Sequence, residues 1–184
     1  MGYLFHLVGP PGSGKRTIGL KLSALTGAVL LDNPLFNDAV FRPYGADGLR
    51  SIPEEIHVLA TQVRKLGLEA ARLAPRDVSQ IFTSYLTNRP SGPAALQLVR
   101  NLAAARDVRY IPVWLECDVE ELERRLSLPE RLERAKLRDP AILRETLRTS
   151  GMLSAPPDAI RIDTLALAPA DAARLIAEHS GALF

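Results

Sequence analysis

The sequence predicts a three-layer α/β/α domain built on a five-stranded parallel sheet. Short apolar runs alternate with amphipathic helical stretches along the 184 residues, which is typical of parallel strands joined by helices. The first run, Tyr3 to Val8, leads into a glycine-rich loop at residues 9–17 and then into helical periodicity. No repeat or interdomain linker divides the chain. We therefore expect one domain, residues 1–184, with strand order 2-3-1-4-5 and the loop after strand 1.

The later strands are predicted from their apolar, β-branched content. They cover residues 28–31, 78–83, 108–115 and 160–163. Pro112 lies within the fourth of the five strands and suggests that its pairing begins late, because proline cannot donate a backbone hydrogen bond.

Helices are predicted between these strands. The helix after the glycine loop carries Ile18, Leu22 and Leu25 at helical spacing and ends at Gly27. The pattern Ser51–Glu54 resembles a capping box and opens a helix whose inward face is predicted to be Ile56, Leu59, Val63, Leu66, Ala70 and Leu73. Further helices are expected to begin at Ser91, Asp118 and Asp139, with a closing helix over 169–179. Residues 35–50 are predicted to form a polar loop with aromatic inserts.

Composition narrows the class of protein. The chain is 47% hydrophobic and 24% charged, which predicts a globular fold. A net charge of +2 gives no argument for nucleic acid or membrane as partners. One cysteine, Cys117, permits no internal disulfide, and no apolar stretch reaches 18 residues. We therefore expect a cytoplasmic protein with small-molecule partners, either a monomer or a small homo-oligomer.

The glycine loop fits the phosphate-binding pattern G-x-x-x-x-G-K. In such a loop, backbone amides surround a polyphosphate, a lysine neutralises it, and the following helix presents free N–H groups. The residue after the lysine is usually Ser or Thr, whose hydroxyl joins the Mg²⁺ shell, but here it is Arg16 and the hydroxyl follows at Thr17. The predicted phosphate-binding residues are Gly9, Pro10, Pro11, Gly12, Ser13, Gly14, Lys15, Arg16 and Thr17.

Polar side chains at two strand ends are candidates for the chemistry, because ligands bind at the carboxyl edge of open α/β sheets. Asp32 follows the second strand. Its carboxylate could hold a Mg²⁺-bound water or accept a proton from a substrate hydroxyl, or it could cap the turn that follows. Thr83 and Ser84 end the third strand and could hydrogen-bond an acceptor. No acidic residue stands there, which argues against motor ATPases.

Two segments are predicted to enclose the ligand-binding site at this edge of the sheet. Residues 33–52 would roof an acceptor pocket, where Arg42 and Tyr44 suit an anionic or ring-bearing acceptor, although the aromatic residues could equally pack this segment onto the sheet. Residues 124–150 are rich in arginine and could close over the phosphates, stabilising charge and excluding water. The interleaved glutamates offer an alternative, in which the arginines lie on a solvated helix face.

With these motifs in place, the chain resembles the small P-loop kinases, such as nucleoside monophosphate, shikimate and gluconate kinases. The resemblance rests on the loop, on Asp32, on residues 113–118 with the helix ending at Arg124-Arg125, and on 162–164 with the closing helix. The position of Thr17 is similar to that in the loop G-x-P-G-x-G-K-G-T of nucleoside monophosphate kinases.

This resemblance implies transfer of the γ-phosphoryl group of ATP to a small acceptor, with Mg²⁺. It implies that Thr17 and Asp32 lie in the metal shell and that Arg125 lies near the adenine. The implied catalytic residues are Lys15, Asp32, Arg131 and Arg134, and the candidate acceptor residues are Asp32, Arg42, Tyr44, Thr83 and Ser84.

The acceptor itself is left open. Pro34 replaces the second strand-end acid of shikimate kinases, and residues 84–86 replace their glycine triplet. A metabolite, a nucleotide or an antibiotic all remain possible acceptors. An alternative from another class is a nucleotide-binding regulatory module that hydrolyses ATP slowly and has no acceptor.

Overall fold

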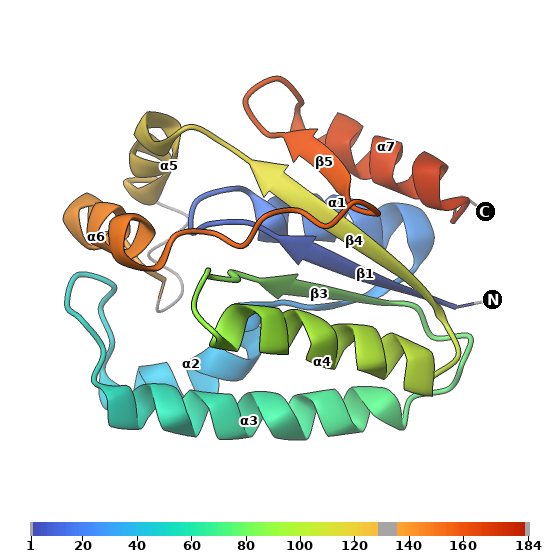
Figure 1. Cartoon of the computed structure of the whole chain (residues 1–184), viewed down its shortest axis with the longest axis horizontal. Helices are drawn as coiled ribbons and strands as arrows, with labels where there is room; N and C mark the ends of the chain where they lie inside the picture. The colour runs from blue at the N-terminus through green and yellow to red at the C-terminus, as the bar shows by residue number, and fades with distance from the viewer. Residues whose placement is uncertain (1, 129–135, 183–184) are drawn as a thin grey trace.

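A computed structural model describes residues 2–128 and 136–182. It contains one five-stranded parallel sheet in the order β2-β3-β1-β4-β5, so the predicted strand order is confirmed (Figure 1). The strands are β1 (Tyr3–Val8), β2 (Val29–Leu31), β3 (Gln80–Ser84), β4 (Arg109–Glu116) and β5 (Ile160–Asp163).

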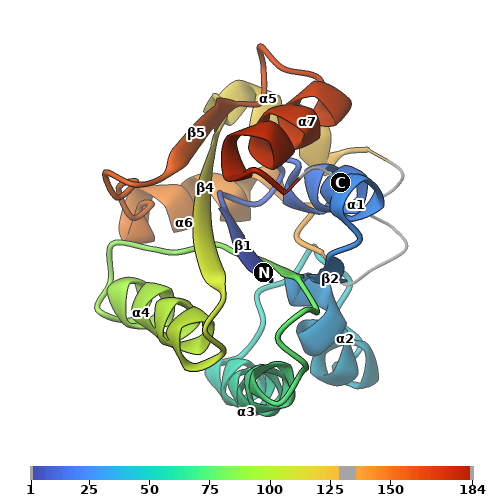
Figure 2. The same cartoon turned by 90° about the vertical axis from the view of Figure 1, so that its right-hand side faces the viewer.

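Helices cover both faces of the sheet, as predicted. They are α1 (Lys15–Thr26), α2 (Asn33–Tyr44), α3 (Glu54–Arg72), α4 (Ser91–Ala105), α5 (Val119–Leu126), α6 (Pro140–Ser150) and α7 (Pro169–Ser180). Figure 2 shows α1 and α7 on one side of the sheet and α3 and α4 on the other. No helix in the described ranges is long and apolar enough to cross a lipid bilayer.

The central strand β1 is apolar because both of its faces are covered. Its side chains alternate between two cores. Phe5 and Leu7 pack with Ile18 of α1 and Ile176 of α7, whereas Leu4 belongs to the core formed with α2, α3 and α4. This burial places the glycine loop, which follows β1 directly, at the carboxyl edge of the sheet.

Pro112 limits the pairing of β4 on one side only. β4 pairs with β1 from Arg109 onward, but it pairs with β5 only from Val113 onward. The late pairing that we predicted therefore holds at the β5 side, where no strand lies beside Pro112.

The predicted polar loop over residues 35–50 is wrong, because α2 occupies Asn33–Tyr44. Asp32 begins this helix: its Oδ1 accepts a hydrogen bond from the Leu35 amide at 3.2 Å, and Pro34 lies in the first turn. Phe36 and Phe41 are buried. These two rings lie against α3, Phe36 beside Gly67 and Phe41 beside His57, and this burial stabilises helix over loop.

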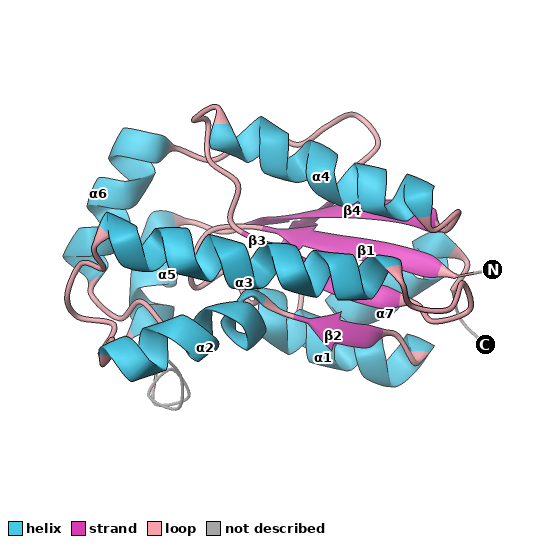
Figure 3. Ribbon diagram, turned by 90° about the horizontal axis from the view of Figure 1, so that it is seen from below, coloured by secondary structure: helices cyan, strands magenta, loops and turns pink. Residues whose placement is uncertain are grey.

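The predicted inward face of α3 is also displaced. Leu59, Leu66 and Leu73 are 45%, 73% and 71% exposed, whereas Ala60 and Ala71 are buried. Small residues face inward because α2 and α4 flank α3 closely (Figure 3). The capping box is wrong as well, since Pro53 is the N-cap residue of α3 and provides no side-chain hydrogen bond.

Candidate active site

The glycine loop adopts a backbone that favours glycine at two positions. Gly12 and Gly14 have φ values of +90° and +86°, a region that side chains rarely occupy. A Cβ atom on Gly12 would lie 3.0 Å from the Leu122 carbonyl oxygen, so the glycine also lets α5 lie against the loop. Gly14 is the N-cap residue of α1, and the first N–H groups of that helix are available to an anion.

The Lys15 amino group lies over the loop. Its Nζ donates to the carbonyl oxygens of Gly9 and Pro10, both at 2.7 Å. A phosphate group would compete with these neutral oxygens, because hydrogen bonds between two charged groups are stronger. The lysine is therefore placed where it can neutralise a bound polyphosphate.

Asp32 joins the first turns of two helices. Its Oδ2 accepts a hydrogen bond from Arg16 Nη1 in an ion pair, while its Oδ1 caps α2. The structure thus supports the capping alternative for Asp32 and also turns the carboxylate toward the P-loop, where it contacts Arg16. The Asp32 side chain is 4% exposed and that of Arg16 is 32% exposed.

A cavity of about 640 Å³ lies over the P-loop. Residues 11–18 form its floor, and five other parts of the chain complete it. These parts are the α5 region and the loop after β5 (Glu121, Arg124, Arg125, Leu128, Thr164, Leu167 and Pro169), the β2–α2 region (Asn33, Pro34, Asn37, Asp38 and Phe41), and the end of β3 (Thr83 and Tyr85), together with Lys136 and Leu137.

Arg125 connects α5 to the loop after β5. It donates to Thr164 Oγ1 at 3.1 Å, to the Thr164 carbonyl oxygen at 2.8 Å and to Glu121 Oε1 at 2.7 Å. Hydrogen bonds from Arg124 and Arg125 lower the pKa of Glu121 to about 2, so this carboxylate remains charged at neutral pH. The structure therefore holds Arg125 against the segment that follows Asp163, and both line one end of the cavity.

The other end of the cavity contains one of the two predicted β3 residues. Thr83 lines it, and its Oγ1 accepts a hydrogen bond from the Asn33 amide at 3.0 Å. Ser84 does not line it, because its hydroxyl lies 2.9 Å from His6 Nε2 in the buried layer between the sheet and its helices. Tyr85 does line the cavity and donates to the Gly151 carbonyl oxygen at 2.6 Å. Successive side chains of a strand point to opposite faces of the sheet, so Thr83 faces the cavity while Ser84 faces the core.

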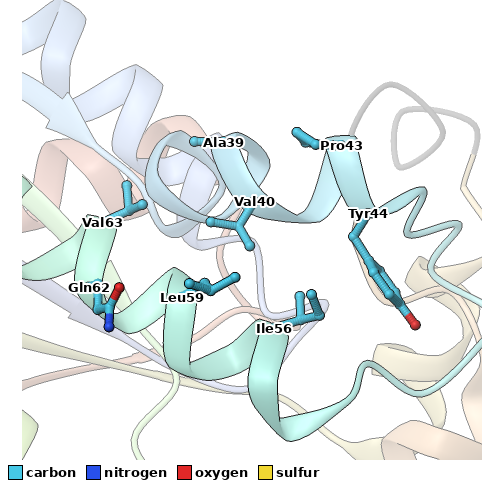
Figure 4. A pocket seen from close by; sticks show the side chains of 8 residues that line it. All are labelled: Ala39, Val40, Pro43, Tyr44, Ile56, Leu59, Gln62 and Val63. Carbon is cyan, nitrogen blue, oxygen red and sulfur yellow. The ribbon is translucent and has the colours of Figure 1, made fainter.

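Arg42 and Tyr44 are not among the residues that line this cavity. Arg42 Nε lies 3.5 Å from Asp38 Oδ2 in an ion pair. Tyr44 lines a separate apolar groove between α2 and α3 (Figure 4). Asn37, which was not among the predicted site residues, does line the main cavity; its helical spacing from Asn33 is the one signal in the sequence that could have indicated it. Arg131 and Arg134 lie outside the described residues.

The side-chain oxygens near the P-loop can supply only part of a magnesium coordination shell. Mg²⁺ in kinase sites is held by one or two protein groups together with substrate phosphates and water. Thr17 is exposed and lines the cavity, so its hydroxyl suits this role. The Asp32 oxygens already accept hydrogen bonds from Arg16 and Leu35. No cluster of three or more His, Cys, Asp or Glu side chains able to hold a metal occurs within residues 2–128 and 136–182.

Comparisons with known proteins identify the fold. No model of a protein family matches the chain, and no curated protein matches it. Among solved structures, a sugar kinase from Janibacter sp. HTCC2649 is 19% identical, with a TM-score of 0.64 over 97% of this chain and 94% of that one. A putative kinase from Chloroflexus aurantiacus is 16% identical, with a TM-score of 0.66 over 100% and 98%.

Shikimate kinase from Acinetobacter baumannii, in complex with shikimate, is 23% identical, with a TM-score of 0.52 over 96% of this chain and 92% of that one. The likeness to these three structures extends over nearly the whole of each chain. The chain therefore has the fold of the small P-loop kinases, and residues 9–17 are its P-loop.

Proposed function

We propose that the protein is a small-molecule kinase that transfers the γ-phosphoryl group of ATP to an acceptor with a nucleophilic oxygen. The observation that carries this proposal is the continuity of one cavity, from Arg125 across the P-loop to α2 and Tyr85. ATP hydrolysis needs room only for water, whereas the space beside Asn37 and Tyr85 can take a second substrate. The fold shared with a sugar kinase and a shikimate kinase supports the same reading.

The residues of the P-loop would hold the phosphates. In this proposal the backbone amides of residues 12–17 bind the β-phosphate, and Lys15 leaves the Gly9 and Pro10 carbonyls to bridge the β- and γ-phosphates. Arg125, fixed by Thr164, marks the adenine end of the cavity. Phosphoryl transfer depends on positioning and on stabilising charge on the phosphoryl oxygens, and these groups supply both.

Magnesium would neutralise charge on the transferred group. Thr17 is the residue proposed to hold it. Asp32 was predicted beside Thr17 in the metal shell, and its contacts better support a role in holding Arg16. The cytoplasmic location, the oligomeric state and the participation of Arg131 and Arg134 stay predictions from the sequence.

A panel of metabolites and antibiotics, scored by ADP release from ATP, tests the proposal. One class of compound is expected to raise ADP release well above background and to gain one phosphoryl group by mass spectrometry. Lys15→Ala is expected to abolish this stimulation, and Lys21→Ala, on the exposed side of the same helix, serves as the matched control. A protein that binds ATP but releases ADP at the same slow rate with every compound would instead be a nucleotide-dependent regulatory module.

A further inference from the structure

Arg16 occupies a loop position where a hydroxyl or a glycine is expected. The lysine before it and the threonine after it both line the cavity, and so does Arg16 itself. Three adjacent residues therefore present an ammonium, a guanidinium and a hydroxyl to whatever binds over the loop. The guanidinium is the unusual member of this set.

The ion pair with Asp32 fixes the position of this guanidinium. Asp32 lies almost fully buried behind it, while about a third of the Arg16 side chain is exposed, so the positive member of the pair is the one nearer the cavity. Asp32 is itself held by the Leu35 amide in the first turn of α2. A buried carboxylate that is anchored on both oxygens holds its partner more rigidly than an exposed one does.

The pairing leaves hydrogen-bond donors for a ligand. A guanidinium has five N–H donors in a planar fork that matches carboxylate and phosphate oxygens. Within residues 2–128 and 136–182, the Arg16 side chain makes one hydrogen bond, from Nη1 to Asp32 Oδ2. Donors on Nε and Nη2 are thus available beside Lys15, at the place where the phosphates would lie.

We propose that Arg16 is a phosphate-binding residue of the nucleotide site, that Asp32 is its positioning residue, and that the guanidinium facing the cavity does part of the work that a divalent cation ordinarily does at the phosphates. This inference rests on the proposed function only in requiring that the cavity bind a nucleotide. It predicts that nucleotide binding by the wild-type protein depends less on Mg²⁺ than binding by a variant with an uncharged residue at position 16.

Calorimetric titration of the full chain with ADP, in EDTA and in Mg²⁺, tests the proposal. The wild-type protein is expected to bind ADP in both buffers. Arg16→Gln is expected to weaken binding in EDTA about 10- to 100-fold, the worth of one hydrogen bond to a charged group, and to weaken binding in Mg²⁺ much less. Arg16→Lys, which keeps the charge, should recover part of the loss.

Two variants separate the pair from other effects. Asp32→Asn removes the charge but keeps an equally good helix cap, so α2 should stay folded, and its effect should not add to that of Arg16→Gln. Arg72→Gln makes the same substitution at an exposed arginine near the end of α3 and should change neither affinity. Thermal unfolding of each variant verifies the fold.

Equal weakening of ADP binding in EDTA and in Mg²⁺ by Arg16→Gln, or no weakening in either, would overturn the proposal. ADP binding with the expected pattern but without phosphorylation of any acceptor would leave it standing and count against the kinase. Failure of the wild-type protein to bind ADP in either buffer would overturn both.

Discussion

The Nε2 atom of His6 lies 2.9 Å from the Ser84 hydroxyl, inside the layer between the sheet and its helices. The other ring nitrogen, Nδ1, lies 2.9 Å from the Tyr110 hydroxyl, so one imidazole links side chains of β3, β1 and β4. The Ser84 carbonyl oxygen accepts a hydrogen bond from the amide of Gly9, the first P-loop residue, at 3.1 Å. A buried polar chain thus lies directly beneath the start of the phosphate-binding loop.

Protonation of His6 should destabilise the fold. Burial, with smaller contributions from Arg64 and Arg100, lowers the pKa of His6 to about 3 from an ordinary value of 6.5. Between these values the unfolded state binds a proton and the folded state does not, so the free energy of unfolding falls as pH falls, by about 1.4 kcal/mol per pH unit. Urea unfolding at pH 7 and pH 5 should show a loss of about 2 kcal/mol from this residue.

His6→Gln is the control for this prediction, because glutamine keeps a donor and an acceptor but does not titrate in this range. Its stability should fall less than that of the wild-type protein between pH 7 and pH 5. Glu121 and Asp47, whose pKa values are lowered to about 2, lose their contributions mainly below pH 5. An identical pH slope in the two proteins would contradict the prediction.

Removing Lys15 should affect turnover more than nucleotide binding. In the proposed site the other phosphate contacts come from backbone amides and from Arg16, which Lys15→Ala retains, whereas charge on the transferred group develops most in the transition state. We expect kcat to fall on the order of 100-fold or more and ADP affinity to fall much less. Steady-state kinetics with an acceptor from the panel, together with calorimetry, measure both quantities. Equal losses would indicate that Lys15 serves binding alone.

Arg125 and Arg124 offer a matched comparison at the far end of the cavity. Both donate to Glu121, but only Arg125 also contacts Thr164. Lysine cannot reproduce a planar guanidinium that bonds to two groups at once, so Arg125→Lys should weaken ADP binding about tenfold. Arg124→Lys should change it less than Arg125→Lys does. Similar affinities for the two variants would argue against a role of Arg125 at the nucleotide.

Gly67 should resist replacement by alanine, although alanine normally favours a helix. A Cβ atom there would lie 2.1 Å from Cε1 of the Phe36 ring, so α2 and α3 would have to separate. We expect Gly67→Ala to destabilise the protein by about 1–3 kcal/mol, measured by urea unfolding. In Gly19→Ala the nearest contact is the flexible tip of Leu30, and the cost should be smaller. Stabilisation by Gly67→Ala would refute this account of the α2–α3 contact.

Local sequence patterns predicted the helices and strands whose stability depends on residues that are close together in the sequence. Strand β1 and helix α1 were visible because an apolar run, a glycine loop and a helical period stand next to one another. Helix α2 was missed because the contact of Phe36 with Gly67 of α3 joins residues far apart in the sequence. The exposure of Leu66 has the same origin, since the positions of α2 and α4 decide which face of α3 is buried.

The sequence by itself determined the phosphate-binding loop and the order of the layers. Glycines with positive φ, a lysine and a helix N-terminus act together within nine residues, so proximity in the chain is enough to place them. Tertiary structure alone decided that Asp32 pairs with Arg16 and that Tyr85 lines the cavity while Tyr44 does not. It also decided that the Ser84 side chain is buried beside His6. These positions lie on different elements, and the packing of α2 and α5 against the sheet edge determines which of their side chains meet.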